Sequence, residues 1–476
     1  MEEAGNSRKK EPGTWMSFLV FGIAIAIILT GVVILDYDIH IVLLLALVFV
    51  CVVSGTLGYS FDEQVEFMKK ALGQAMSAMI IFIFIGVIIA SWIFSGTVQT
   101  LIYYGLQYIS PTVFLPMGLI LCSLTSMSIG TSWGTIGTMG IAMMGIGSGM
   151  GIPPAVTAGM VISGSFFGDK MSPISDTTNL APAAVGTTLH KHISAMKTTL
   201  PAYIVSFIAF VVIGLSYQNG EINTETVAVF TDTIHANFKV SPVLMLPMIV
   251  LLILNLIKFP AIPGMAIGSL LGVILAVTVQ GIPLAEVIAG LNYGYVQSTG
   301  VEVVDKLLCR GGIQNMMYTF SLSCIAISFG GVMEHVGYLR KIVAVVISRV
   351  KKDALLVPIV IASTTLGTLT MGEVYLSIVV NGNLYKETFK ERGLRPEMLS
   401  RLLEEGGTLT QCFIPWSTSG VFILATLGVG AGEYWKYAVL NYVNPLLSIG
   451  LAVFGIGILH VCDEKNFQKV KKKEVF

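Results

Sequence analysis

The most constraining feature of this sequence is a series of apolar runs, each about 20 residues long. A helix of about 20 residues rises about 30 Å, which is the thickness of the hydrocarbon core of a bilayer. Because backbone polar groups in lipid must be hydrogen-bonded internally, such runs are expected to form membrane-spanning helices. The clearest runs are residues 16–35, 40–59, 74–94, 198–217, 241–258, 262–280, 314–333 and 437–459. The chain is therefore predicted to be an all-α polytopic membrane protein.

Composition agrees with this prediction and excludes several other classes. Of the 476 residues, 54 % are apolar and only 12 % are charged, and the mean hydropathy is +0.81. Soluble domains carry roughly 25 % charged residues. The 28 basic and 28 acidic residues cancel, so no basic surface for nucleic acid is predicted. The six cysteines are scattered without paired spacing, which predicts neither a disulfide framework nor a metal site built on cysteine.

Basic residues in the short loops predict the orientation, because Lys and Arg favour the cytoplasmic side. Basic clusters precede the first run and follow the last one, so both termini are predicted to be cytoplasmic. The first run is too long for a signal peptide and has no small-residue cleavage site, so it is predicted to remain as a span. The predicted units are a cytoplasmic tail (1–15), a first membrane repeat (16–217), an external loop (218–240), a second repeat (241–460) and a basic cytoplasmic tail (461–476).

Two stretches of the first half are not expected to be simple spans. Residues 111–151 are interrupted by the polar, Gly-rich segment 130–135. Residues 152–188 are interrupted at 169–170 and again at 173–182. Gly, Pro and polar residues at this density break a helix, and the freed backbone groups are tolerated at membrane depth only where they line an enclosed cavity. These stretches are predicted to be re-entrant or unwound segments.

The second half repeats the pattern of the first at a constant offset. An offset of 242 (396 minus 154) places Pro396 on Pro154 and Gly372 on Gly130 without a gap. Chance matching of two Gly-rich segments is the alternative explanation. The predicted orientations favour a repeat, since the span before the first broken stretch runs outward and its counterpart, residues 314–333, runs inward. We therefore expect two inverted-topology repeats with about ten crossings and two re-entrant hairpins, whose discontinuous helices meet at the midplane.

The densest polar cluster lies at residues 163–179, at predicted membrane depth. A charge at the bilayer centre costs at least roughly 2.5 to 3.5 kcal/mol, so such residues usually face a cavity and mark ion pathways. Asp169 and Lys170 are adjacent and could form a structural ion pair. Asp176 has no adjacent basic residue and is followed by oxygen donors, so it is the main candidate for binding a cation. The predicted cation and proton site in this half comprises Asp169, Asp176, Thr177, Thr178 and Asn179, with Asp176, Thr177 and Asn179 as the Na⁺ ligands.

The second half contributes a pair of adjacent carboxylates, Glu404 and Glu405. They lie either within the membrane or near its cytoplasmic rim, where Arg401 could pair with one of them. Two neighbouring carboxylates at low dielectric cannot easily both be ionised, which suits a proton carrier. Hairpin packing and helix capping are the alternative roles for the polar residues around both sites. The predicted supporting residues of the cavity are Thr131, Ser132, Thr135, Lys170, Glu373, Thr408, Ser417 and Thr418.

Three elements together resemble the NhaC family of Na⁺/H⁺ antiporters, within the ion-transporter superfamily. They are residues 168–182 (Gly-Asp-Lys-Met-Ser-Pro-Ile-Ser-Asp-Thr-Thr-Asn-Leu-Ala-Pro), residues 130–135 (Gly-Thr-Ser-Trp-Gly-Thr) and residues 414–416 (Ile-Pro-Trp). The resemblance implies exchange of cytoplasmic Na⁺, or Li⁺, for external H⁺, in sodium extrusion and pH homeostasis across a bacterial inner membrane. The family also includes exchangers of malate with H⁺ against lactate with Na⁺, so small carboxylates are the alternative cargo. Where family members carry Glu-Asp-Ser-Gly-Thr, this chain has Glu-Glu-Gly-Gly-Thr at 404–408.

The sequence therefore predicts a secondary transporter and not an enzyme. Its partners would be the lipid bilayer and the transported Na⁺ and H⁺, with no cofactor, and a homodimer is left open. Asp176, with Asp169 and Glu405, would bind either a cation or protons, and competition for these carboxylates would couple the two fluxes. In an organic-acid exchanger, Lys170 would instead supply the counter-charge for the cargo. A passive channel and an intramembrane enzyme are rival classes, although no nucleophile and base pair or metal-ligand spacing supports an enzyme.

Overall fold

The computed structural model describes residues 11–217, 224–257, 259–348, 350 and 352–461. Within these ranges the chain is helical and contains no strand, apart from an isolated bridge between Leu394 and His460. Most of the two predicted cytoplasmic tails and the start of the predicted external loop lie outside the described residues. The predicted all-α class is therefore confirmed for the part of the chain that the structure describes.

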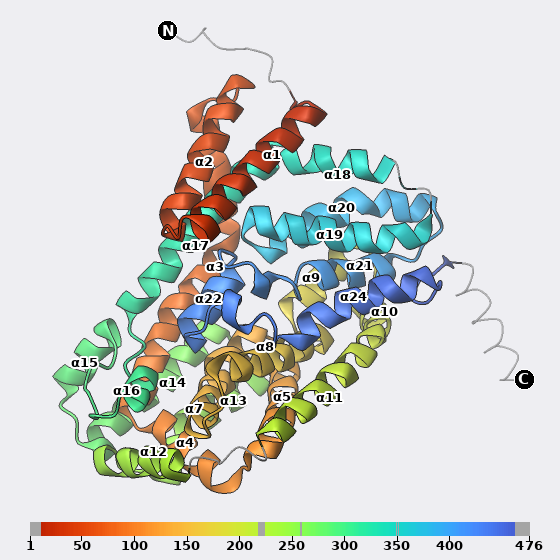
Figure 1. Ribbon diagram of the computed structural model, residues 1–476. Helices are drawn as coiled ribbons and strands as arrows, with labels where there is room; N and C mark the ends of the chain where they lie inside the picture. The colour runs from red at the N-terminus through yellow and green to blue at the C-terminus, as the bar shows by residue number, and fades with distance from the viewer. Residues whose placement is uncertain (1–10, 218–223, 258, 349, 351, 462–476) are drawn as a thin grey trace, which may run out of the picture.

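The first half contains eleven α-helices in chain order, followed by α12 in the connection between the halves (Figure 1). They are α1 (Thr14–Leu29), α2 (Ile39–Thr56), α3 (Phe61–Phe94), α4 (Thr97–Tyr108), α5 (Pro111–Ile129), α6 (Ser132–Thr135), α7 (Ile141–Gly149), α8 (Pro154–Met171), α9 (Asp176–Val185), α10 (Leu189–Ala195), α11 (Leu200–Ser216) and α12 (Thr224–Asn237). Short π or 3-10 turns continue some of them: η1 (Thr30–Ile34), η2 (Ile136–Gly140) and η3 (Met196–Thr199).

The second half begins with the 3-10 turn η4 (Pro242–Met245). Its helices are α13 (Leu246–Leu256), α14 (Ala261–Leu275), α15 (Leu284–Tyr293), α16 (Glu302–Leu308), α17 (Ile313–Val336), α18 (Tyr338–Ser348), α19 (Asp353–Met371), α20 (Val374–Glu391), α21 (Pro396–Gly406), α22 (Thr418–Leu427), α23 (Ala431–Tyr434) and α24 (Val439–Val453). The π turn η5 (Ala276–Gln280) continues α14, and the 3-10 turn η6 (Gln411–Phe413) lies between α21 and α22.

Eight helical segments of the described chain are long and apolar enough to cross a membrane. Six of them coincide with runs predicted from hydropathy, and the other two are α5 and α19. The predicted run at 241–258 forms one arm of a helix pair bent by 93° (Ala228–Asn237 and Pro242–Leu254), which makes a ninth span if counted as one. The run at 437–459 contains α24, which is a shorter apolar helix of 15 residues. The chain is therefore a multi-pass membrane protein with eight or nine candidate spans in its described part.

Helix boundaries in the two halves recur at the offset of 242 residues. The bounds of α5 and α19 differ by 242 at both ends, and so do those of α9 and α22. Both α5 and α19 contain an interior proline, Pro116 and Pro358, again 242 apart. Both end on a glycine with positive φ, Gly130 (80°) and Gly372 (64°), a backbone conformation that favours glycine. The same local structure is thus built twice along the chain.

In each half, two interruptions of the helices lie beside predicted site residues. We name residues 130–131 and 172–175 the first break, and residues 372–373 and 407–417 the second break. The first break is narrower than the sequence predicts. Residues 132–135 form α6, and α8 continues through Asp169 and Lys170 to end at Met171, so the break expected at 169–170 is wrong. The break expected at 173–182 is limited to 173–175, because α9 is helical from Asp176 onward. The C-cap Ser172 is extended, as expected for a residue that precedes a proline, here Pro173. The helix α9 then starts behind the capping residue Ser175.

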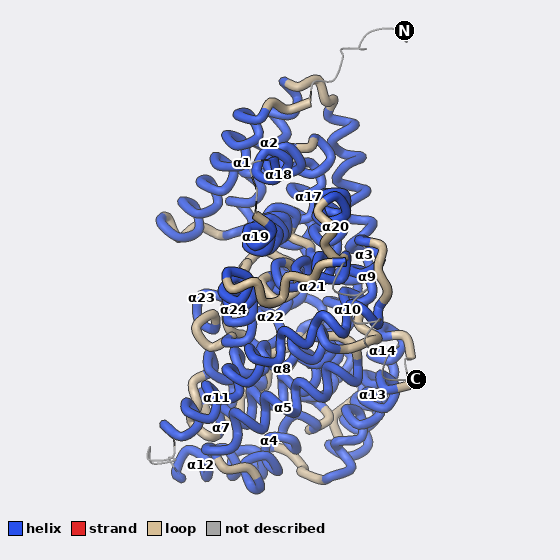
Figure 2. The backbone as a smooth tube through the Cα atoms, turned by 90° about the vertical axis from the view of Figure 1, so that its right-hand side faces the viewer, coloured by secondary structure: helices blue, strands red, loops and turns tan. Residues whose placement is uncertain are grey.

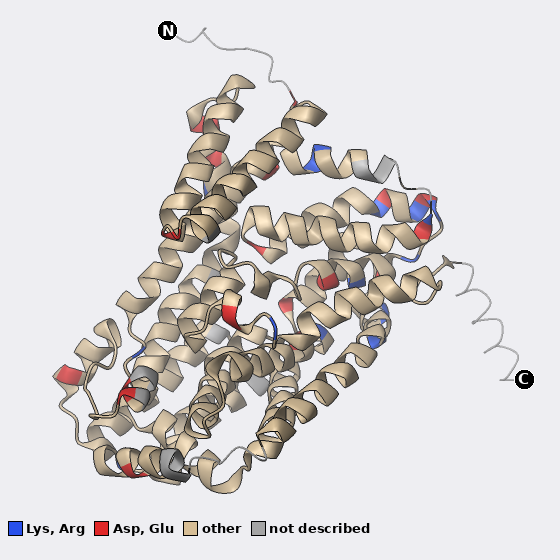
Figure 3. Cartoon of the chain, viewed as in Figure 1, with Lys and Arg blue, Asp and Glu red and all other residues tan. Residues whose placement is uncertain are grey.

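The breaks lie in the middle of the molecule. Figure 2 shows α1, α2 and α18 at one end of the structure, α4 and α12 at the other, and α9, α21 and α22 between them. The corresponding helices α3 and α17 pack along each other, as do α5 and α8, while α9 packs against both α20 and α21. Charged residues are sparse along most helices. Figure 3 shows many of them near the start of α19 and the end of α20, on the right of the view. Segments far apart in the sequence are therefore brought together around the breaks.

Candidate functional site

Asp169 is the charged residue most closely held by the first break. It lies in the last turn of α8 and is buried. Ser132, the first residue of α6, donates from Oγ to Asp169 Oδ2 at 2.7 Å. Ser175, which caps α9, donates from Oγ to Asp169 Oδ1 at 2.5 Å. Two hydroxyl donors from two different helix starts stabilise the negative charge of this carboxylate and fix its position.

A cavity of about 550 Å³ opens beside this carboxylate. Its wall includes Asp169, Asp176, Thr131 and Ser132 from the first half, and Tyr375 and Gln411 from the second half. Among the described residues that line it, the two aspartates are the acidic ones, and none is Lys, Arg or His. Two carboxylates, with no cationic side chain among the described residues of the wall, make the cavity attractive to cations and unattractive to anions.

The four residues that begin α9 divide into two groups. Asp176 is exposed and Thr177 is buried, and both line the cavity. Thr178 and Asn179 instead stabilise the break itself. Thr178 Oγ1 donates to the Asp169 carbonyl at 3.1 Å, and Asn179 Nδ2 donates to the Ser175 carbonyl at 2.7 Å. Of the three residues predicted to bind Na⁺, the structure brings Asp176 and Thr177 to the cavity and directs the amide nitrogen of Asn179 to the backbone.

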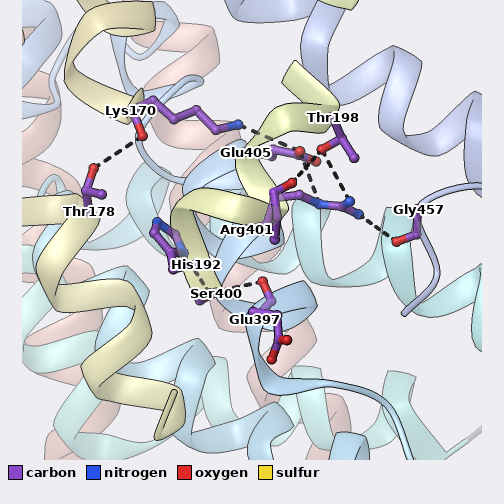
Figure 4. Close-up of polar contacts among 10 residues, drawn as sticks. Lys170, Thr178, His192, Thr198, Glu397, Ser400, Arg401, Glu405 and Gly457 are labelled. Carbon is purple, nitrogen blue, oxygen red and sulfur yellow. Dashed lines mark hydrogen bonds and ion pairs between the residues drawn. The ribbon is translucent and has the colours of Figure 1, made fainter. Parts of the chain in front are cut away.

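Lys170 does not pair with its neighbour Asp169, contrary to the structural ion pair considered from the sequence. Its Nζ lies 3.7 Å from Glu405 Oε1 on α21, and both side chains are fully buried (Figure 4). The same Glu405 oxygen lies 3.5 Å from Nε of Arg401, which is also buried. The guanidinium of Arg401 donates in addition to Thr198 Oγ1 at 3.3 Å and to the Gly457 carbonyl at 3.2 Å. Glu405 therefore links α8 and α21 in a buried cluster that does not line the cavity.

Glu404 lies next to this cluster but has different surroundings. Its side chain is fully buried, with the hydroxyls of Thr177 and Thr408 as neighbours. Neither of its carboxyl oxygens has a hydrogen bond of ordinary geometry with any residue that the structure describes. An ionised carboxylate is costly in such a place, which makes Glu404 a candidate for a group that carries a proton.

The predicted supporting residues of the second break mainly stabilise helix starts. Glu373 is buried and its Oε1 accepts from the Tyr375 backbone at 3.3 Å, which caps α20. Ser417 Oγ accepts from the Gly420 backbone at 3.0 Å and caps α22. The Thr418 backbone donates to the Gly372 carbonyl at 2.8 Å, which joins the two segments of this break. In the first break Thr135 Oγ1 donates to the Thr131 carbonyl at 3.2 Å. The Glu373 and Ser417 contacts match the capping alternative considered from the sequence, whereas the Thr135 hydroxyl bonds to a carbonyl one turn earlier.

Three residues at the site, Ser175, Gln411 and Tyr375, are not among those predicted from the sequence. Ser175 holds Asp169, and Gln411 and Tyr375 line the cavity from the second half. The repeat offset could have found two of them. Gln411 lies 242 residues after Asp169 (411 minus 169), and Ser175 is the counterpart of Ser417, which was singled out. Nothing in the local sequence marks Tyr375.

Comparison with known proteins decides the family. The model of the Na⁺/H⁺ antiporter family matches residues 13–178 and 164–456, which together span almost the whole chain. The chain belongs to the Na⁺/H⁺ antiporter family. The resemblance to NhaC antiporters is thereby confirmed, and the antiporter names of the relatives are consistent with a transporter.

Individual relatives in this family carry different cargoes in their names. The chain is 35 % identical to the Na(+)/H(+) antiporter NhaC of Alkalihalophilus pseudofirmus, over 94 % of this chain and 97 % of the relative. It is 34 % identical to the malate-2H(+)/Na(+)-lactate antiporter of Bacillus subtilis, over 93 % and 94 %. It is 31 % identical to the arginine/ornithine antiporter ArcD of Halobacterium salinarum, over 94 % and 93 %. Family membership therefore establishes antiport and leaves the cargo to be argued from the site.

Proposed function

We propose that this protein is a secondary antiporter that exchanges cytoplasmic Na⁺, or Li⁺, for external H⁺. Its role would be sodium extrusion and pH homeostasis across a bacterial inner membrane, with both termini in the cytoplasm. The observation that carries the proposal is the cavity with Asp169 and Asp176 in its wall and no cationic side chain among the described lining residues. A NhaC antiporter that is 35 % identical supports it.

Coupling of the two ions would follow from competition for the same carboxylates. A carboxylate that holds Na⁺ cannot be protonated at the same time, so only one of the two cargoes occupies the site. Ser132 and Ser175 would keep Asp169 in place in both states. Thr177 would add a hydroxyl oxygen for Na⁺, and Glu404 would take up a proton where no solvent reaches it.

Alternating access would come from the repeated architecture. In our proposal the two halves are inverted-topology repeats with about ten crossings, and residues around the two breaks form re-entrant hairpins. The recurrence of helix ends at an offset of 242 supports this arrangement, as does the assignment of basic loops to the cytoplasm. In such transporters the substrate binds near the midplane and one repeat moves against the other.

The organic-acid alternative has support from the malate-2H(+)/Na(+)-lactate relative. A carboxylate cargo needs a cationic or strongly donating group in the site, and Lys170 is the candidate from the sequence. In the structure Lys170 is paired with Glu405 and does not line the cavity. The charge of the cavity therefore favours a cation as cargo.

The direct test uses the purified protein in liposomes with an internal pH dye and an imposed pH gradient. Na⁺ or Li⁺ alone should dissipate the gradient, and K⁺ should have a much smaller effect. Asp169→Asn, checked for insertion and folding, should abolish the response to Na⁺. If the gradient persists until malate or lactate is added, the organic-acid alternative is correct and the proposal is wrong.

A further inference from the structure

We propose that the cavity also takes an organic cation, namely a primary amine with an apolar tail, whose ammonium occupies the place that Na⁺ would take. The inference rests on the proposed function only for the location of the cation site. It is carried by the size of the cavity and by the division of its wall into a polar and an apolar part.

The cavity is larger than a monovalent metal ion requires. Its volume is about 550 Å³. Pockets for organic ligands have volumes of roughly 300 to 1,000 Å³, whereas one water molecule accounts for about 30 Å³. A bare or partly hydrated Na⁺ would therefore occupy only a small part of the cavity volume. On the same scale of roughly 30 Å³ per water-sized group, the volume corresponds to about 18 such groups, which is room for an organic molecule with about ten non-hydrogen atoms together with some water.

The wall of the cavity has an apolar side formed mainly by α3. Ile81, Ile85 and Ile88 line it at a spacing of four and three residues, which places them on one face of the helix. Further apolar residues come from the second half of the chain, namely Leu251, Phe259 and Met265. An apolar tail that packs on this face would be removed from water, and the burial of its apolar surface would stabilise the bound state. A metal ion has no apolar surface to bury.

The polar side of the cavity fits an ammonium group. It carries Asp169, Asp176 and Gln411. Gln411 is buried and also lines the cavity. A primary ammonium has three donors and no acceptor, so it can pair with carboxylates and needs no donor from the wall.

The same wall disfavours a cargo that also carries a carboxylate. No described residue of the lining is basic, so the carboxylate of an amino acid would meet Asp169 and Asp176 without a counter-charge. A second ammonium at the end of the tail would face the isoleucines of α3. The preferred cargo is therefore a monoamine and not a dibasic amino acid.

Binding can be measured on the full-length protein in detergent or nanodiscs without any Na⁺ gradient. Trp133 lines the cavity and stacks on Phe422, with ring centroids 4.9 Å apart, so its fluorescence should report occupancy. Titration with 2-phenylethylamine should change the tryptophan emission in a saturable way. Trp133→Phe should remove that change. Trp435→Phe, at a half-exposed position directly after α23, should keep it.

Matched ligands test the chemistry of the site. The anion 3-phenylpropionate and the neutral 2-phenylethanol should each bind at least 10-fold more weakly than 2-phenylethylamine. Ethylamine, arginine and ornithine should also bind at least 10-fold more weakly. Equal binding of the anion or the alcohol would overturn the role of the carboxylates, and equal binding of ethylamine or ornithine would overturn the role of the apolar wall. No saturable response to 2-phenylethylamine would overturn the whole inference.

Two variants locate the bound amine. Asp169→Asn should weaken 2-phenylethylamine at least 10-fold. Ile85→Trp should fill the apolar side of the cavity. The measured quantity is the inhibition constant of 2-phenylethylamine against Na⁺ exchange, divided by the KM for Na⁺. This ratio should rise at least 10-fold in the variant. Ile81→Phe serves as the second variant if Ile85→Trp does not fold. An unchanged ratio in the folded variant would contradict the proposed placement.

The two proposals fail in different ways. If 2-phenylethylamine binds but Na⁺ and Li⁺ do not dissipate a pH gradient, the amine site stands and the proposed exchange is wrong. If Na⁺ dissipates the gradient and 2-phenylethylamine neither binds nor competes, the exchange stands and the amine inference is wrong.

Discussion

The two breaks share several helix ends and differ in length and in chemistry, since the interruption at 172–175 in the first break is shorter than the one at 407–417 in the second. In both, a long helix with an interior proline ends on a glycine with positive φ, and a serine then caps a ten-residue helix. The first break places carboxylates at the cavity, Asp169 and Asp176. At the corresponding positions the second break has the neutral residues Gln411 and Thr418.

The acidic residues of the second half have other positions and other partners. Glu373 caps a helix and Glu405 neutralises two buried cations. Neither Glu373 nor Glu405 is among the described residues that line the cavity. The comparison teaches that similar helix ends occur in both halves, while the carboxylates in the wall of the cavity, among the described residues, come from the first half.

The largest expected effect tests this asymmetry directly. Asp169→Asn should lower the initial rate of Na⁺-driven H⁺ movement in liposomes about 1,000-fold, or about 4 kcal/mol, because the charge that pairs with the cation is lost. Gln411→Leu, at the corresponding position of the second half, should lower it only about fivefold, through the loss of one hydrogen-bonding group. Similar losses in both variants would contradict a division of labour between the breaks.

A second prediction concerns the buried ion pairs. Glu405→Gln should destabilise the protein by about 3 kcal/mol, because Lys170 and Arg401 would remain buried without their shared counter-charge. The thermal midpoint in detergent measures this loss. The control is Glu387→Gln, which removes an exposed i,i+3 pair with Lys390 and should cost under about 0.5 kcal/mol. A thermal midpoint equal to that of the control would show that the cluster carries no structural role.

The two glycines that end α5 and α19 sharpen the backbone part of the comparison. Gly130→Ala should destabilise by about 2 to 3 kcal/mol, because φ is positive and the new Cβ would lie 2.5 Å from Ile174 Cγ1. Gly372→Ala should cost about 1 to 2 kcal/mol, since its Cβ would lie 3.0 Å from that of Ala326. Gly432→Ala, with nothing within 4 Å, is the control. Denaturation in detergent that ranks Gly372→Ala as the worse variant would refute the expected order.

The smallest effect concerns a carboxylate outside both breaks and outside the candidate spans. Hydrogen bonds from Ser298 Oγ (2.5 Å) and from Thr299 Oγ1 and its backbone (2.6 Å each) hold the pKa of Asp305 below its ordinary value. The resulting stabilisation is present above the ordinary Asp value of about 3.9 and is lost as the pH falls through the lowered pKa.

Hydrogen exchange at the Thr299 amide, corrected for its intrinsic rate, measures this stabilisation. Protection should stay constant from about pH 8 to about pH 5 and weaken only below the ordinary Asp pKa of about 3.9. Asp305→Asn should abolish the pH dependence. Loss of protection near pH 7 would show that this loop titrates with the transport site and that the site is not confined to the breaks.

The sequence by itself determined the membrane class, most of the candidate spans, the offset of 242 residues at which helix bounds recur, and the family. Each of these depends on local properties. The thickness of a bilayer sets the length of an apolar run, and Gly or Pro acts on its own turn of helix, so the first break could be predicted to within a few residues. The helix α24 was harder to predict, because an apolar run does not by itself show where the helix ends.

Only the tertiary structure decided which charges meet. Asp169 and Lys170 are adjacent in the sequence and invited a mutual pair, but consecutive residues of an α-helix point about 100° apart, since one turn takes 3.6 residues. One side chain of α8 therefore reaches the cavity with Ser132 and Ser175, and the next reaches Glu405 on α21. That partner is 235 residues away in the chain (405 minus 170), a separation that local sequence patterns cannot resolve. The packing of α8 against both halves, and not the order of residues, assigns one charge to the cargo and the other to the framework.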